Sequence, residues 1–173
     1  GICQVSSTLY NAAIQAGLKI NTREPHGLKP NYIEMGHDAT VTDDGRNDLI
    51  FTNTTGADIY VVARVETSGK TKRCLFQFYG RPDPDGYTYS LESETIEVIP
   101  IPETTPIPDK KAEYVVYTDQ TKEVSKGSEG YKVTTYLVTR DANGNVIATK
   151  ELYTDTYKAT AAKVYVGVTE RYQ

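Results

Sequence analysis

The chain has 173 residues and a formal net charge of −4, and 38% of its residues are hydrophobic, so we expect one large or two small domains with a modest core. Its basic residues are scattered, which excludes the concentrated positive footprint that binding to nucleic acid or an anionic membrane requires. No apolar run approaches the ~18 residues of a membrane-spanning helix.

The first predicted element is an amphipathic helix that begins after Gly1 and stops at Gly17. Its apolar side chains recur three and four residues apart, as they do on one face of a helix, and glycine is common just past a helix end. The predicted apolar face consists of Val5, Leu9, Ala12, Ala13 and Ala16.

Cys3 lies in or next to the first turn of this predicted helix. Unpaired N–H groups and the positive end of the helix dipole stabilise a thiolate there, and the thiolate is the nucleophilic form of cysteine. Cys3 is therefore a candidate catalytic nucleophile. The alternative is an inert cysteine that packs the start of the helix.

Three strand-like segments rich in β-branched and aromatic residues follow the helix. The third contains Cys74, which is predicted to be a small hydrophobic side chain facing a core. A disulfide between Cys3 and Cys74 is an open alternative and would block the nucleophile. Asp43-Asp44-Gly45 lacks a terminal bidentate glutamate, so a turn is favoured over a calcium loop. The three segments are residues 48–52, 58–65 and 71–79.

The second half begins with a proline-rich stretch, residues 99–112. Alternating prolines favour an extended, semi-rigid backbone, which suits a connector or an edge strand. Asp141-Ala142-Asn143-Gly144 predicts a hairpin turn, because Asn-Gly tolerates positive φ. The aromatic residues beyond the prolines are all tyrosines, predicted to pack across strands, with sugar stacking as the alternative. The predicted strands are residues 113–118, 130–140, 146–156 and 163–169.

The string from Gly1 to Ala12 reads Gly-Ile-Cys-Gln-Val-Ser-Ser-Thr-Leu-Tyr-Asn-Ala and resembles the core motif of the VanW family, a bacterial cell-envelope domain. The resemblance covers about residues 1–98. In that family an earlier stretch of the domain normally precedes the cysteine block, so we expect this chain to be an N-terminally truncated part of a longer protein. Further matches follow in the same order at Pro25-His26, Gly36-x-Asp38-Ala39-Thr40-Val41 and Phe51-x-Asn53-x-Thr55.

Residues 127–136, Asp141-x-Asn143-Gly144 and residues 154–160 resemble the five-glycine (G5) extracellular domain. That resemblance implies an elongated β module for adhesion, with a glycan containing N-acetylglucosamine as its proposed ligand. The namesake glycines are incomplete, since this half keeps Gly127, Gly130, Gly144 and Gly167.

These features predict an α+β fold, in which one N-terminal helix packs on an antiparallel β domain and an elongated all-β module follows. The expected divisions are a VanW-like domain at residues 1–98, a proline-rich connector at 99–112 and a G5-type module at 113–173, which could begin near residue 96.

The VanW resemblance implies an LD-transpeptidase-like cysteine enzyme, or an LD-carboxypeptidase, that acts on peptidoglycan. Cys3 would form a thioester with the tetrapeptide stem, which a neighbouring stem resolves into a 3-3 cross-link. His26 would be the base, because histidine titrates near neutral pH, and Asp38 would orient its imidazole. The other histidine, His37, is predicted to be a solvated or hydrogen-bonded surface group.

Backbone N–H groups at the helix start, near Gln4 and Val5, would form an oxyanion hole for this reaction. Ser6 is polar enough to help position the substrate, although helix capping explains Ser6 and Ser7 equally well.

The competing interpretation is a non-enzymatic envelope protein for binding or adhesion, linked to glycopeptide resistance, with the VanW half as a scaffold. The expected partners are peptidoglycan stem peptides and glycan containing N-acetylglucosamine, with no nucleic acid and no membrane span in this chain. Neither a cofactor nor a metal is expected, since no cysteine and histidine spacing resembles a zinc site. The expected location is extracellular or at the cell envelope, in a parent protein that is exported or membrane-anchored.

Overall fold

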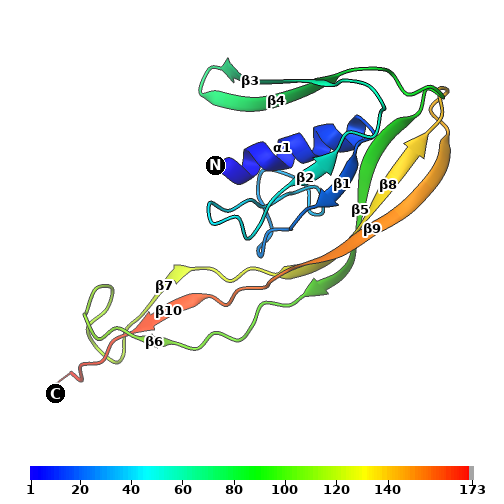
Figure 1. Cartoon of the computed structure of the whole chain (residues 1–173). Coiled ribbons are helices and arrows are strands. Elements are labelled where there is room, and N and C mark those ends of the chain that lie inside the picture. Colours follow the sequence, from blue (N-terminus) through cyan, green and yellow to red (C-terminus); the bar gives the residue numbers. More distant parts are fainter. Residues whose placement is uncertain (172–173) are drawn as a thin grey trace.

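The computed structural model describes residues 1–171, which form one α-helix and ten β-strands (Figure 1). Every strand pair is antiparallel except the short parallel pair of β6 and β10, which confirms the predicted α+β class. Within these residues no helix combines the length and apolar character that crossing a bilayer requires. The elements are α1 (Ile2–Gln15), β1 (Lys19–Thr22), β2 (Ile50–Thr52), β3 (Tyr60–Ser68), β4 (Thr71–Tyr79), β5 (Thr88–Ile99), β6 (Ile107–Pro108), β7 (Thr121–Ser125), β8 (Gly130–Arg140), β9 (Val146–Tyr157) and β10 (Lys163–Val166).

One long sheet, in the order β5–β8–β9, joins strands from both sides of the proline-rich stretch (Figure 1). The turn predicted between β8 and β9 is confirmed, since the Gly144 N–H donates to Asp141 O at 2.9 Å and Gly144 has a φ of +86°. A separate, elongated all-β module stays a prediction, because two of its expected strands, β8 and β9, share this sheet with β5. The remaining strands, β6, β10 and β7, form a small sheet near the C-terminal end.

The helix α1 packs against β4, β5 and β1, but its buried face differs from the predicted one. Val5 was expected to face the core and is 42% exposed. The helix is rotated because the hydroxyls of Ser6 and Ser7 bond to the backbone of Ala39, so polar residues can occupy the inner face. The helix ends as predicted, with Gly17 following at a φ of +69°. The buried face consists of Ser6, Ser7, Tyr10, Ala13 and Ile14.

The strands predicted from sequence correspond to β2, β3, β4, β8, β9 and β10, but the strand predicted at 113–118 is wrong. There the carboxylate of Asp109 accepts the backbone N–H groups of residues 113–115 at 2.6 to 3.1 Å. The amide oxygen of Gln120 accepts those of residues 116–117 at 3.2 and 3.1 Å. Side-chain acceptors thus take these N–H groups in place of a ladder, and Tyr117 forms an isolated parallel bridge with Thr169. The strands β1, β5 and β7 have no predicted counterpart, whereas β6 is an edge strand within the proline-rich stretch, one of the two structures predicted there.

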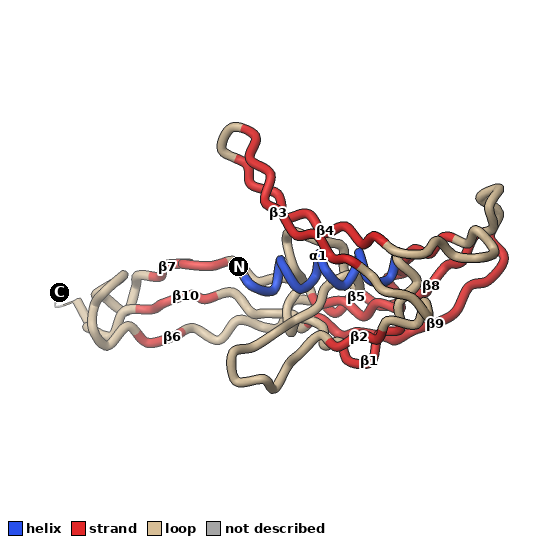
Figure 2. Tube along the Cα trace, turned by 45° about the horizontal axis from the view of Figure 1, so that its top comes forward, coloured by secondary structure: helices blue, strands red, loops and turns tan. Residues whose placement is uncertain are grey.

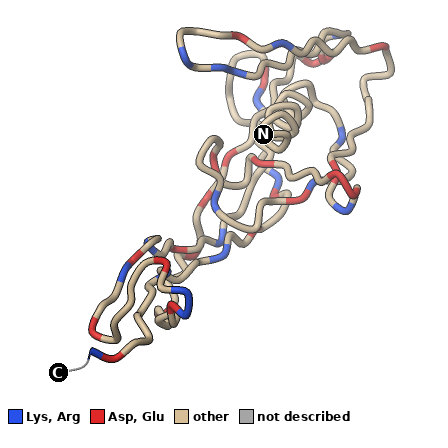
Figure 3. The backbone as a smooth tube through the Cα atoms, turned by 90° about the vertical axis from the view of Figure 1, so that its left-hand side faces the viewer, with Lys and Arg blue, Asp and Glu red and all other residues tan. Residues whose placement is uncertain are grey.

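The hairpin of β3 and β4 projects from the body of the molecule, and all of β3 is exposed (Figure 2). Cys74 lies on β4 and is half-buried, rather than enclosed in a core as predicted. Both cysteines are free, so the alternative of a disulfide to Cys3 is not realised. Acidic and basic residues are interspersed along the backbone of both halves (Figure 3).

Candidate functional site

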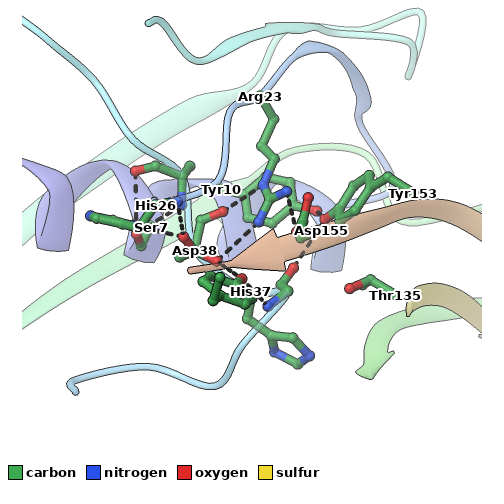
Figure 4. A network of polar contacts seen from close by, with 12 residues as sticks. Ser7, Tyr10, Arg23, His26, His37, Asp38, Thr135, Tyr153 and Asp155 are labelled. Carbon is green, nitrogen blue, oxygen red and sulfur yellow. Dashed lines mark hydrogen bonds and ion pairs between the residues drawn. The ribbon is translucent and has the colours of Figure 1, made fainter. Parts of the chain in front are cut away.

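Asp38 is the central side chain of the candidate site and is fully buried in the loop between β1 and β2 (Figure 4). Its Oδ1 accepts hydrogen bonds from Tyr157 Oη at 2.6 Å and from Arg23 Nη2 at 3.0 Å. Its Oδ2 accepts the backbone N–H of His26 at 2.7 Å and lies 2.7 Å from His26 Nδ1. The acceptor sites of both carboxylate oxygens are therefore occupied.

Arg23 links this carboxylate to neighbouring elements, and only 3% of its side chain is exposed. Its Nε donates to Asp38 O at 2.6 Å, and its Nη1 donates to Asp155 Oδ2 at 2.6 Å. The guanidinium also lies over the ring of Tyr153, 4.4 Å from the centroid. Two carboxylates and an aromatic face thus surround a cation that would otherwise be costly to bury.

The strand β9 supplies three alternating residues, Tyr153, Asp155 and Tyr157, which point to the same face of the sheet. Tyr153 Oη donates to Gly36 O at 3.1 Å, and the Gly36 N–H donates to Tyr157 Oη at 2.6 Å. A Cβ at Gly36, where φ is +83°, would collide with the side chain of Thr135, so glycine permits this close approach. The loop that carries the buried carboxylate is therefore hydrogen-bonded to β9 and packed closely against β8.

The two buried carboxyl groups near Arg23 have opposite pKa shifts. Burial alone would raise the pKa of Asp38, but its hydrogen bonds from Tyr157 and His26, together with Arg23, hold that pKa below its ordinary value. Burial raises the pKa of Asp155 despite the opposing effect of Arg23. Burial and the hydrogen bond to Asp38 also raise the pKa of Tyr157, so this phenol stays protonated and can donate. The surroundings thus favour the ionised form of Asp38 more strongly than that of Asp155.

His26 lies on the solvent side of the network, with 23% of its side chain exposed. An ionised Asp38 can only accept, so we assign the proton of the neutral imidazole to Nδ1 and the free lone pair to Nε2. Nε2 lies 3.3 Å from Tyr32 Oη, and the two rings meet edge to face with centroids 6.0 Å apart. The nitrogen that could act as a base thus faces a tyrosine that is 40% exposed.

Cys3 is the second residue of α1, and its position in the first helical turn confirms the prediction. The partly exposed thiol donates to Val41 O at 3.5 Å. The carbonyl of Cys3 accepts from Ser7 Oγ at 2.7 Å, and the Ala39 N–H donates to the same Ser7 Oγ at 2.9 Å. Ser6 Oγ lies 2.6 Å from Ala39 O. The first turn of α1 is therefore fastened to the segment that directly follows the buried carboxylate.

Of the three predicted catalytic residues, His26 and Asp38 are in contact, whereas the thiol of Cys3 is hydrogen-bonded to neither of them. Among the predicted substrate-positioning groups, the Gln4 N–H donates to Gly1 O at 3.1 Å, and the Ser6 hydroxyl is turned into the protein interior. Val5 remains exposed at the helix surface.

Two secondary expectations are wrong. Ser6 and Ser7 do not cap the helix, because its N-cap is Gly1 and their hydroxyls reach carbonyl groups in and beyond the first turn. His37 is not a solvated surface group, since it is half-buried, its Nε2 has no hydrogen-bond partner, and burial lowers its pKa. Its ring points away from the network in Figure 4. Within residues 1–171, no three histidine, cysteine or acidic side chains cluster as ligands of a metal ion would.

Sequence reasoning missed four residues of the network, namely Arg23 and Tyr157, which bond to Asp38, and Tyr153 and Asp155, which contact Arg23. One signal was present, because a tyrosine, an aspartate and a second tyrosine alternate along a predicted strand and an inward-facing aspartate there needs a partner. Arg23 is three residues before His26 in a loop, and nothing in the local sequence indicates which carboxylates it would meet.

Comparisons with known proteins gave matches by sequence and by structure. Residues 1–75 match the family model described as VanW like protein. The uncharacterized protein YoaR of Bacillus subtilis (strain 168) is 45% identical over 64 residues, which are 37% of this chain. The matched part covers 21% of that relative's length.

Two solved structures also match. The crystal structure of HP0197-G5 is 22% identical, covers 47% of this chain and 97% of its own, and has a TM-score of 0.24. The IgA1 protease G5 domain is 16% identical, covers 49% of this chain and 94% of its own, and has a TM-score of 0.30. The matching family model is thus a VanW model, and the titles of both matching structures name a G5 domain; these are the two families that the sequence resembles.

Proposed function

We propose that this chain carries the catalytic residues of an LD-transpeptidase-like cysteine enzyme that acts on peptidoglycan. One observation supports this most. Hydrogen bonds join the helical turn that carries Cys3 to the segment that directly follows Asp38. A thiol at a helix N-terminus, together with a histidine held by an ionised carboxylate, is the set of groups that acyl transfer through a thioester uses.

In the first half-reaction, the thiolate of Cys3 attacks the carbonyl carbon of residue three in a tetrapeptide stem. A C–S bond forms, and the peptide bond to the terminal D-alanine breaks. His26 takes the thiol proton at Nε2 and gives it to the amine of the departing D-alanine. Asp38 accepts the Nδ1–H throughout and stabilises the imidazolium between the two transfers.

In the second half-reaction, the side-chain amine of residue three on a neighbouring stem attacks the thioester carbon. A C–N bond forms, the C–S bond breaks, and His26 carries the amine proton to the sulfur of Cys3. The product is a 3-3 cross-link. If water attacks in place of the amine, the same site acts as an LD-carboxypeptidase and releases a tripeptide stem.

Proton transfer between Cys3 and His26 requires both side chains to leave their present partners. The bond from Cys3 Sγ to Val41 O, at 3.5 Å, is weak because S–H is a poor donor, and the contact of 3.3 Å between His26 Nε2 and Tyr32 Oη is weak because it is long. Tyr32 is also 40% exposed, so it borders the solvent from which a stem would arrive. In this proposal the arriving stem displaces Tyr32, and Nε2 then faces the thiol.

The cell envelope is the proposed location, because it contains this substrate and because residues 1–75 match the VanW model. The G5-type half would hold the enzyme on glycan that contains N-acetylglucosamine. Substrate and glycan would then be met on the same polymer, which raises the effective concentration of stems near Cys3.

The test uses the full-length protein that contains this chain, incubated with disaccharide-tetrapeptide muropeptides and followed by mass spectrometry. Wild type is expected to release D-alanine and form dimers or tripeptides, Cys3→Ala to leave the substrate unchanged, and Cys74→Ala to match wild type. Equal turnover by wild type and Cys3→Ala would refute the proposal.

A second candidate is a non-enzymatic envelope-binding protein, which is favoured by the hydrogen bond from Cys3 to Val41 O in place of one to His26. Under this alternative, wild type and Cys3→Ala should cosediment equally with purified sacculi and neither should alter muropeptides. The two assays together separate the candidates.

A further inference from the structure

The two oxygens of the Asp38 carboxylate face different partners. Oδ1 receives Tyr157 Oη at 2.6 Å and Arg23 Nη2 at 3.0 Å, whereas Oδ2 receives the backbone N and the Nδ1 of His26. The carboxylate cannot turn out of its present plane without losing hydrogen bonds in a fully buried place. The two donors on Oδ1 therefore keep Oδ2 on the histidine.

These two donors are themselves held by neighbouring groups. Tyr157 Oη accepts the Gly36 N–H at 2.6 Å, so its own proton points to the carboxylate. Arg23 Nη1 donates to Asp155 Oδ2 at 2.6 Å, and the guanidinium of Arg23 lies over the ring of Tyr153. Tyr153, Asp155 and Tyr157 all lie on one face of β9. The strand thus determines how the carboxylate is turned.

We propose that Tyr157 and Arg23 are positioning residues that, through Asp38, hold His26 with its proton on Nδ1 and leave Nε2 as the basic nitrogen. Only the use of Nε2 as a base rests on the proposed function, since the fixed tautomer follows from the hydrogen bonds alone. β9, which lies in the second half, then completes a site whose other members lie in the first half. Histidine free in water favours the opposite tautomer, with the proton on Nε2, so an Nδ1–H form is a specific signature.

The test is the ¹⁵N NMR spectrum of the histidine side chains in the whole chain, at alkaline pH where imidazole is neutral. The chain has two histidines, and His37→Gln assigns the signals of His26. Tyr157→Phe removes the hydroxyl that bonds to Asp38. Tyr131→Phe is the matched control, because Tyr131 is paired directly with Tyr157 across β8 and β9 and its hydroxyl bonds to exposed Glu129.

The expected result is the Nδ1–H tautomer in wild type and in Tyr131→Phe, and a mixture rich in the Nε2–H tautomer in Tyr157→Phe. In the muropeptide assay, Tyr157→Phe should lower kcat roughly tenfold or more with little change in KM. An unchanged tautomer in Tyr157→Phe overturns the positioning role, even if turnover requires Cys3. A changed tautomer in a protein without turnover supports the positioning role and counts only against the proposed function.

Asp155→Asn keeps the test decisive if Tyr157→Phe does not fold. It weakens the hold on Arg23 Nη1 and leaves the direct contacts of Asp38 in place. A smaller shift toward the Nε2–H tautomer is expected, and no shift at all would overturn the proposal.

Discussion

Cys3 and Cys74 differ at the residue scale in a way that reagents can measure. Both thiols are free and partly buried, but only Cys3 lies in the first turn of a helix. The N-terminal end of a helix stabilises a thiolate, so Cys3 should react with iodoacetamide at neutral pH ~10-fold or more faster than Cys74. Peptide mapping by mass spectrometry gives both rates in one sample.

The same assay tests the proposed link to the histidine. His26→Ala should slow alkylation of Cys3 and leave Cys74 unchanged, whereas His37→Ala should affect neither thiol. Equal rates for the two cysteines in wild type would contradict an activated thiol and favour a packing role for Cys3.

Asp38 should dominate the acid stability of the protein. Its pKa in the folded state is lower than normal, so its stabilising effect is present above the ordinary aspartate pKa of ~3.9 and is lost as pH falls through the lower folded pKa. Asp38→Asn breaks a buried ion pair with Arg23 and should cost about 3–5 kcal/mol at pH 7.

Urea unfolding at several pH values measures this effect. The difference between wild type and Asp38→Asn should be largest near pH 7 and shrink below pH 4, while Asp43→Asn on the exposed turn should follow wild type throughout. A difference that does not change with pH would mean that Asp38 acts through shape rather than charge.

The role of a residue could be predicted from the sequence when its partners are close to it in the chain, and not when they are distant. The helical position of Cys3 follows from nearby spacing, and it was predicted. The hydrogen bonds that link Asp38 to Arg23 and Tyr157, and Arg23 to Asp155, span 15 to 132 residues of sequence, and periodicity does not report such distances. The rotated face of α1 was missed because the partner of Ser6 and Ser7 is the backbone of a distant loop.

Gly17 is informative at the scale of a single element, because it ends α1. Gly17 and Gly45 share a φ of +69°, but a Cβ at Gly17 would lie 2.8 Å from the ring of Tyr89, whereas nothing lies within 4 Å of one at Gly45. Gly45→Ala should therefore cost only the backbone term, about 1–2 kcal/mol.

Gly17→Ala should cost more than Gly45→Ala, since it must also displace Tyr89. Thermal melts followed by circular dichroism compare the two variants with wild type. Equal destabilisation would mean that the ring of Tyr89 moves freely.

Strands were predictable where β-branched residues alternate between turn residues, as in β3, β4, β8 and β9. Residues 113–118 have the same composition but lie beside Asp109, whose carboxylate takes the backbone donors. β5 was not predicted because its glutamates and serines form a polar segment without the β-branched composition of the other strands. Its partner strand, β8, is also distant in the sequence. The local sequence pattern thus predicted where strands lie, but not which groups form hydrogen bonds with their backbone N–H and C=O groups.

The two halves of the chain depend on each other at the scale of the whole molecule. β8 lies between β5 and β9, and the Arg23–Asp155 ion pair and the Tyr157–Asp38 hydrogen bond join the first half to β9. Residues 1–112 alone should therefore unfold without a cooperative transition, whereas residues 1–173 should show one. A cooperative melt of 1–112 at the temperature of the whole chain would show that its first half is an independent domain.

The central claim is that Cys3 forms a thioester with a peptidoglycan stem, and intact-protein mass spectrometry tests it most directly. Full-length protein is mixed with a disaccharide-tetrapeptide and quenched in acid, which preserves thioesters. Wild type and Cys74→Ala are expected to gain the mass of the stem without its terminal D-alanine, and Cys3→Ala to gain nothing. An adduct that persists in Cys3→Ala, or folded wild-type protein that forms none while its substrate stays intact, would contradict the account.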